Sequence, residues 1–280
     1  MNLTPEKLVR DAKTISSLPT VFQKLNSAVN DPRASNRDIA NIISGDSGLA
    51  ARLLRVANSA FYGFPSKIDT VTRAVTVLGT RQLRDLALAT SVLQMFEGMS
   101  DDIVSMESFW MHSIACAVAA RILAGYRREP NVERFFVAGL VHDIGRLVIL
   151  MQYPEQEREV IMAARERGEL LHKLEKEQFG FDHSAVGSLL LKSWKIPEHT
   201  VTAIAYQHRP SLASDSPDAT IVHVADIIAT AAQLGNSGER LVPSLDEKAW
   251  ENLDMSESII PPLMAQLETQ FEDALKLILP

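Results

Sequence analysis

The sequence has little cysteine: Cys116 is the single one among 280 residues. No disulfide can form within the chain, and this absence fits a reducing compartment such as the cytoplasm. Cys116 lies in an apolar helical run, where a free cysteine is commonly a small buried core residue. We therefore expect a packing role for Cys116 and no functional thiol.

The sequence also has fewer positively charged than negatively charged residues. The chain has 28 Lys and Arg against 35 Asp and Glu, which gives a formal net charge of −7. Nonspecific binding of nucleic acid needs clustered Lys and Arg, so this balance disfavours such a role. Several arginines in the first half of the chain are explained more simply by a solvated helix face. These arginines are Arg52, Arg55, Arg73, Arg81 and Arg84.

Long apolar runs are missing as well. No uninterrupted run approaches the roughly 18 to 20 residues of a membrane helix. Residues 1–7 also lack the order of a signal peptide, in which an apolar segment follows a basic one. The sequence therefore predicts a protein of the cytoplasm that does not bind a membrane.

No segment alternates apolar and polar residues in the manner of a strand, and no internal repeat occurs. The apolar residues, 46% of the chain, instead recur at helical spacing. Leu49, Leu53 and Ala57 form one such stripe, and Ser35 with Asp38 forms an N-terminal cap before the next apolar face. The sequence predicts an all-α fold with a sizeable core.

A polar stretch from Glu97 to Ser108 interrupts the helical pattern. It separates an N-terminal helical module over residues 1–100 from a second module over 105–235, and a helical extension over 236–280 is expected to pack on the core. In the second module the periodicity predicts helices at roughly 109–124, 133–151, 155–167, 170–179, 182–194, 197–208 and 218–233.

The tetrapeptide His142-Asp143-Ile144-Gly145 stands in an otherwise apolar run. A buried carboxylate without a partner costs several kcal/mol, or its pKa shifts until it becomes neutral. A divalent cation satisfies an imidazole and a carboxylate together. The simpler alternative is a packed histidine beside a helix-capping aspartate, which is the favoured interpretation for an isolated pair of this kind.

Two more residues favour a metal site over a packed histidine beside a capping aspartate. His112 and Asp226 each lie inside an apolar helical stretch, where a polar side chain needs a reason. Adjacent helix positions point about 100° apart, so His142 and Asp143 can share an ion only with help from facing helices. Two imidazoles and two carboxylates suit Mn, Fe, Zn, Mg or Co. The sequence predicts that these four side chains meet around one divalent metal.

The order of the four residues resembles the HD superfamily of metal-dependent phosphohydrolases. His183 and His208 resemble the histidines that HD-GYP domains use for a second or third metal. Upstream, residues 18–25, 46–63 and 74–79 are similar to the HDOD family, the HD-related output domain of bacterial signalling. The Asn58-Ser59-Ala60 and Leu78-Gly79 helix ends carry this similarity, which covers roughly residues 15–235.

The HDOD resemblance implies an HD-domain-like helical bundle with an N-terminal helical module. It also implies a signal-transduction output or regulatory protein that works with other signalling proteins, usually without demonstrated catalysis. The alternative is a metal-dependent phosphohydrolase that cleaves a phosphodiester or nucleotide with a metal-activated water. Asp143 and Arg146 would then be catalytic, and the planar fork of Arg146 suits phosphate oxygens. His183 and His208 would bind a second metal or a phosphate.

The sequence departs from HD-GYP domains at two places. Gln207-His208 stands where that family has two histidines, and residues 209–218 replace its Gly-Tyr-Pro loop. Glutamine is a poor ligand for a borderline metal, so a complete second metal site is not expected.

Three other histidines have simpler interpretations. We expect His172 on a solvated face, His199 in an exposed first turn, and His223 packed or hydrogen-bonded. The aromatic loop Phe61-Tyr62-Gly63-Phe64-Pro65 is either a partner surface or, as the favoured alternative, tucked between the modules.

Overall fold

The structure, a computed structural model, describes residues 3–12, 15, 17–59, 62–64, 66–213 and 216–278, apart from the side chain of Leu277. Over these residues the chain contains helices and turns and no strand, which confirms the prediction of an all-α fold. The chain forms two compact units, which are described separately. Unit 1 contains residues 1–17 and 98–267, and unit 2 contains residues 18–97 and 268–280.

This division differs at both ends from the segments 1–100, 105–235 and 236–280 expected from the sequence. Helix α1 (Pro5–Asp11) packs on α9 and α12 of unit 1. Its Leu8 is buried, and the Leu8 carbonyl accepts a hydrogen bond of 2.7 Å from Gln152 Nε2. Helix α16 (Ile260–Ile278) belongs to unit 2 from residue 268 onward. An apolar stripe predicts that a helix face is buried, but it does not identify the surface that buries it.

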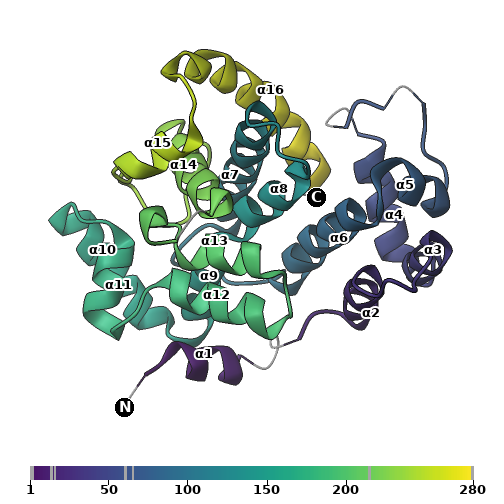
Figure 1. The fold of residues 1–280 in the computed structure, drawn as a ribbon. Helices are drawn as coiled ribbons and strands as arrows, with labels where there is room; N and C mark the ends of the chain where they lie inside the picture. The colour runs from purple at the N-terminus through teal and green to yellow at the C-terminus, as the bar shows by residue number, and fades with distance from the viewer. Residues whose placement is uncertain are drawn as a thin grey trace. The chain divides into compact units, whose positions relative to one another are not determined.

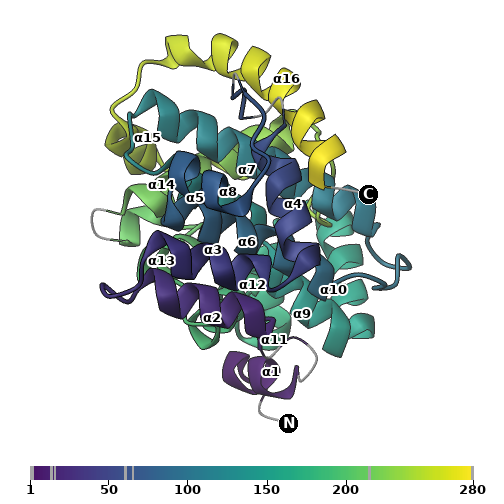
Figure 2. The same cartoon turned by 90° about the vertical axis from the view of Figure 1, so that its right-hand side faces the viewer.

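Unit 2 is built from five short helices and the end of α16. The five are α2 (Thr20–Val29), α3 (Asn36–Ser44), α4 (Ser47–Ala57), α5 (Val71–Leu78) and α6 (Thr80–Met95), which Figure 2 shows in dark colours. The predicted cap at Ser35 is confirmed as a capping box with Asp38. Fully buried side chains such as Phe22, Ile43 and Leu53 form the core of the unit.

Asn58 fixes the connection between α4 and α5. Its Oδ1 accepts a hydrogen bond of 2.7 Å from the Ile68 N–H, and its Nδ2 donates to the Ile68 carbonyl at 2.6 Å. An amide side chain can do both at once, which explains asparagine at this helix end. In the loop that it closes, Tyr62 and Phe64 stack with ring centroids 6.1 Å apart. Phe61 and Pro65, from the same aromatic loop, lie outside the described residues, so neither alternative for this loop is tested.

Unit 1 is arranged around α7 (Met106–Tyr126), which contacts α8 (Val132–Val141) and α14 (Pro217–Ala231) (Figure 1). Fourteen of the 21 residues of α7 are buried, because this helix is apolar on almost every face. Cys116 lies among them with no exposed surface, as the sequence predicts. The core position of α7 lets polar side chains on it meet groups from several other helices.

The remaining helices of unit 1 surround this core. They are α9 (Ile144–Gln152), α10 (Pro154–Arg167), α11 (Leu171–Phe179), α12 (His183–Ser193), α13 (Glu198–Ala205), η1 (Pro210–Leu212), α15 (Glu247–Leu253) and η2 (Glu257–Ile259). Helix α9 packs on α12, and α12 packs on α13.

The segment 133–151, expected as one helix, is broken into α8 and α9. The break occurs at Asp143, whose φ of −98° and ψ of 10° lie outside the helical region. It turns the chain so that His142 ends one helix and Asp143 begins the next. Apolar periodicity does not detect such a break, because the residues on both sides of it are buried.

Two apolar segments of unit 1, α7 and the consecutive helices α8 and α9, are long enough to cross a membrane. The segments are Met106–Tyr126 and Val132–Gln152, and 78% and 89% of their respective apolar windows are buried inside the protein. Their apolar surface is thus already covered by other helices, as in the core helices of a soluble protein.

Candidate metal centre

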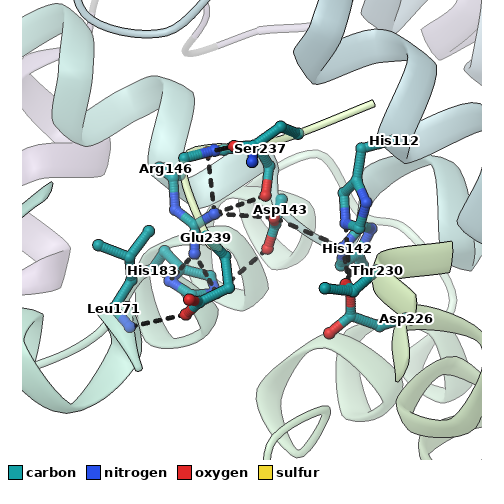
Figure 3. Close-up of polar contacts among 12 residues, drawn as sticks. His112, His142, Asp143, Arg146, Leu171, His183, Asp226, Thr230, Ser237 and Glu239 are labelled. Atoms are coloured by element: carbon teal, nitrogen blue, oxygen red, sulfur yellow. Dashed lines mark hydrogen bonds and ion pairs between the residues drawn. The ribbon is translucent and has the colours of Figure 1, made fainter. Parts of the chain in front are cut away.

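Three of the four predicted metal ligands converge in unit 1. His112 comes from α7, His142 from the end of α8, and Asp226 from α14 (Figure 3). One potential ligand atom of each residue lies within 4.8 Å of the other two, and in the described part of the chain no other group of three His, Cys, Asp or Glu does so. Asp226 Oδ1 is 3.2 Å from His112 Nε2 and 3.6 Å from His142 Nε2. We refer to these three residues as the His112 cluster.

The backbone fixes which nitrogen of His142 faces this cluster. His142 Nδ1 lies 2.7 Å from the Gly139 carbonyl oxygen, which can only accept, so Nδ1 carries the hydrogen. His142 Nε2 is buried and makes no hydrogen bond. A neutral imidazole held through Nδ1, with its Nε2 lone pair free, is the form that binds a metal ion. The donor set therefore fits a divalent cation.

The charges around the cluster lead to the same conclusion. Burial lowers the pKa of His142, but Asp143, Cys116 and Asp226 together outweigh burial and hold the pKa well above its ordinary value. Burial raises the pKa of Asp226, but the neighbouring imidazoles of His112 and His142 outweigh burial and hold the pKa below the ordinary value. The buried carboxylates thus require a positive charge, which is either a proton on His142 or a metal ion.

Asp143, the fourth predicted ligand, lies beside the His112 cluster and is shared with a second group of residues. Its Oδ2 is 3.5 Å from His142 Nε2 and 3.0 Å from Arg146 Nη1. Its Oδ1 is 3.1 Å from His183 Nε2. Figure 3 shows the Asp143 side chain between His142 and the pair formed by Arg146 and His183. Asp143 therefore joins the two halves of the site.

The guanidinium of Arg146 makes hydrogen bonds and ion pairs with several groups of the protein. Its Nη1 donates to Asp143, to the Ser237 carbonyl at 3.0 Å and to Ser237 Oγ at 2.7 Å, and its Nε faces Glu175 Oε1 at 3.5 Å. The residue is 2% exposed. The guanidinium, which the sequence suggested for phosphate oxygens, is thus engaged inside the protein.

His183 and His208 lie next to each other in this second half. His183 Nδ1 is 2.6 Å from Glu175 Oε2, and His183 Nε2 is 2.9 Å from His208 Nε2. Burial lowers the pKa of His183, but the Glu175 and Asp143 carboxylates together outweigh burial and raise the pKa to about 10. Carboxylates of the protein therefore already occupy both ring nitrogens of a charged His183.

His172 is not on a solvated face, so that expectation is wrong. It is half-buried and stacks on His208, with ring centroids 4.2 Å apart. Burial and the nearby positive charge of His183 lower its pKa to about 4. The expectation for His223 is confirmed: it is buried, its Nδ1 lies 2.8 Å from the Gln207 carbonyl oxygen, and its Nε2 accepts from Asp246 N–H. Gln207 itself donates to the His142 carbonyl at 3.0 Å, so it supports the centre without ligating it.

Sequence reasoning missed Glu157, Glu175 and Ser237. Both glutamates have no exposed surface. A signal was present for them, since Glu175 is adjacent to buried Leu174 and four residues after buried Leu171, on the apolar face of α11. Ser237 gives no comparable signal. The chain reaches Arg146 there because the Asn236 N–H bonds to the Ser108 carbonyl at the start of α7.

The Glu157 carboxyl group leads to a prediction on pH. Both of its oxygens are buried without a hydrogen-bond partner, and burial together with the Glu175 carboxylate raises its pKa to about 8. The folded chain keeps this proton while the unfolded chain releases it near the ordinary value of 4.5. This contribution to the free energy of unfolding is fully present below about pH 4.5 and is lost as the pH rises through about 8.

Replacing Glu157 with glutamine is therefore expected to leave stability nearly unchanged at about pH 4 and to raise it by about 2 kcal/mol at about pH 9. Urea unfolding at both pH values measures the difference. The matched control Glu159→Gln, on the exposed side of the same helix, is expected to change stability by less than about 0.5 kcal/mol at either pH. Equal stability of Glu157→Gln and wild type at high pH would contradict the assignment.

The fold and the centre define a helical protein with an HD-type arrangement of histidines and aspartates. The chain belongs to the HDOD family, whose domain model matches residues 15–210. It is 25% identical over 195 residues to an uncharacterised protein of Treponema pallidum. The match covers 69% of this chain, and the chain spans little more than a third, 37%, of the length of that curated relative.

Two solved structures are similar over almost the whole chain. An HDOD domain protein of unknown function from Geobacter sulfurreducens is 23% identical, with a TM-score of 0.80 and 98% of each chain covered. A candidate phosphohydrolase from Shewanella amazonensis is 28% identical, with a TM-score of 0.68 and coverage of 93% of this chain and 94% of that one. The first likeness establishes that the helical fold of this chain is that of HDOD proteins.

Proposed function

We propose that this HDOD protein is a regulatory output protein of bacterial signalling that binds one divalent metal ion through His112, His142, Asp143 and Asp226. The observation that carries the metal centre is the convergence of three ligand atoms from α7, α8 and α14 within 4.8 Å. The buried and unbonded Nε2 of His142 supports it. Membership of the HDOD family supports the signalling role.

The main role of the ion in this proposal is structural. His112 and His142 are 3% and 1% exposed, while the Asp226 side chain is 17% exposed. An ion held there would join three helices that are distant in sequence and would neutralise the buried carboxylates. Mn, Fe, Zn, Mg and Co are all compatible with two imidazoles and two carboxylates.

The contacts in the second half of the site support weak or absent catalysis. A phosphohydrolase needs groups that can reach phosphoryl oxygens as charge develops on them. Arg146 instead donates to Asp143 and Ser237, and His183 faces Asp143 and Glu175. These groups would have to leave strong internal partners before they could act on a substrate.

The alternative function is a metal-dependent phosphohydrolase that acts on a phosphodiester or nucleotide. The observation that favours it is the likeness to the Shewanella protein, a candidate phosphohydrolase that is 28% identical. A bound divalent ion would supply a Lewis acid at the Asp226 side of the centre. Asp143 would hold that ion, and His208, which is half-buried, would contact a phosphate.

One experiment separates the two functions. The protein is purified without a chelating resin, its metal content is measured, and hydrolysis of a generic phosphodiester and of nucleotides is assayed with added Mn or Fe. We expect about one ion per chain and no metal-dependent turnover, and Asp143→Ala is expected to lose most of the ion. Turnover that requires metal and disappears in Asp143→Ala would establish the phosphohydrolase instead, and a chain free of metal would contradict both.

We also propose that the protein works in the cytoplasm with other signalling proteins. The buried thiol of Cys116 and the absence of any other cysteine support a reducing compartment. The burial of both long apolar helices inside unit 1 supports a role away from membranes.

A further inference from the structure

Arg146 lies in a pocket of acidic groups next to the His112 cluster. Its guanidinium is within 3.0 to 3.5 Å of Asp143 Oδ2 and Glu175 Oε1, and Ser237 accepts from it through two oxygens. Two further carboxyl groups, those of Glu157 and Glu239, also act on its charge. The residue is 2% exposed, so water does not compensate these charges.

The groups around this guanidinium are of the kind that a hard or borderline divalent cation uses. They comprise the carboxylate oxygens of Asp143 and Glu175 and the carbonyl and hydroxyl oxygens of Ser237. Asp143 belongs to both sets, because it also approaches His142. The second half of the site thus offers oxygen ligands for a cation, and the guanidinium of Arg146 lies among these oxygens, where such a cation would bind.

We propose that Arg146 is a built-in cation that takes the place of a second metal ion and so limits this centre to a single divalent ion at the His112 cluster. The inference rests on the proposed metal centre and adds the reason why that centre holds a single ion. It also changes the role of Arg146 from a phosphate ligand to a residue that neutralises and positions Asp143.

The charge balance explains why a second ion is excluded. The permanent charge of Arg146 offsets the buried carboxylates of Asp143 and Glu175 that face it. A further divalent ion would bring two positive charges beside the guanidinium in a site that water does not reach. Binding it would require Arg146 to leave several hydrogen bonds at once.

A phosphate-binding role for Arg146 fits these contacts less well. A guanidinium that binds phosphate presents two parallel N–H groups to the ligand. Here Nη1 is used by Asp143 and Ser237, Nε faces Glu175, and Nη2 faces the ring of His183. Groups of the protein therefore already face all three nitrogens of the guanidinium.

The first test uses the wild-type chain with saturating Mn²⁺. Metal analysis after removal of free ion is expected to give one Mn²⁺ per chain, and electron paramagnetic resonance is expected to show an isolated Mn²⁺ spectrum. Two ions per chain with the signal of an exchange-coupled pair would overturn the inference while leaving the metal centre intact. No bound ion would refute the proposed metal centre itself, so the two failures are distinguishable.

The second test replaces Arg146, the proposed built-in cation. Arg146→Ala is expected to bind two Mn²⁺ per chain and to gain more thermal stability from added Mn²⁺ than wild type, since the ion replaces the lost charge. Arg146→Lys, which keeps a positive charge, is expected to bind one, and Glu175→Gln in the Arg146→Ala background is expected to return the count to one. A folded Arg146→Ala chain that binds a single ion would overturn the inference, and the wild-type count decides it if that variant does not fold.

Discussion

Replacing Gly145 with alanine is expected to destabilise the protein by about 3 kcal/mol or more, because overpacking against an immobile neighbour costs about that much. A Cβ atom added at Gly145 would collide with the His183 carbonyl oxygen and the Gly187 backbone nitrogen. Both atoms are backbone atoms of α12, so no side chain can rotate away to make room. Helices α9 and α12 would have to separate, and this would displace His183 and Asp143 from each other.

Chemical denaturation of the variant measures this loss. Gly125→Ala is the matched control, since Gly125 also lies in a helix, its φ is not positive, and an added Cβ would meet nothing within 4 Å. Alanine at such an exposed helical position is expected to be neutral or to stabilise by up to about 1 kcal/mol. A Gly145→Ala chain as stable as wild type would show that α9 and α12 are not packed as closely as described.

Replacing Asp226 with asparagine is expected to weaken binding of the divalent ion by about 100-fold, the upper range for loss of a group that supports a metal site. Asp226 Oδ1 lies near both imidazoles of the His112 cluster, and its carboxylate supplies negative charge that a neutral amide lacks. At a free ion concentration of about 100 times the wild-type Kd, the bound ion stabilises the folded state by about 2.7 kcal/mol. With the weaker affinity, the same concentration gives only about 0.4 kcal/mol.

Isothermal titration with Mn²⁺ or Zn²⁺ and thermal unfolding with and without the ion test this expectation. Glu198→Gln removes an exposed carboxylate of α13 that is not part of the His112 cluster, and it is expected to retain wild-type affinity. If Asp226→Asn binds the ion as tightly as Glu198→Gln does, Asp226 is not a ligand. A stabilisation by metal that is equal in both variants would place the ion elsewhere in the chain.

The helical nature of the chain could be predicted from periodicity, because one buried face of a helix leaves a repeating apolar pattern. The capping box at Ser35 and Asp38 was readable for a similar reason, since it is local in sequence. The assignment of α1 to unit 1 was not readable. Leu8 and Val9 predict a buried face, but only the fold brings α9 and α12 against it.

The residues of the site can likewise be separated into those that the sequence predicts and those that it does not. The sequence identifies His112, His142 and Asp226 as candidate ligands because each is a polar residue in an apolar helix, and the structure brings the three side chains together. The surroundings of Arg146 were not predictable. Glu175 and Ser237 come from α11 and from the segment after α14, and the distance along the chain gives no indication that either reaches the guanidinium.

The sequence alone determined the helical class, the HDOD resemblance and the residues capable of holding a metal ion. These properties depend on residue type and on short-range periodicity, which the chain carries before it folds. Only the tertiary structure decided which donors face each other and which charge already has a partner inside the protein. Electrostatic pairing depends on distances between side chains in space, and those distances are set by helix crossings such as the backbone contact at Gly145.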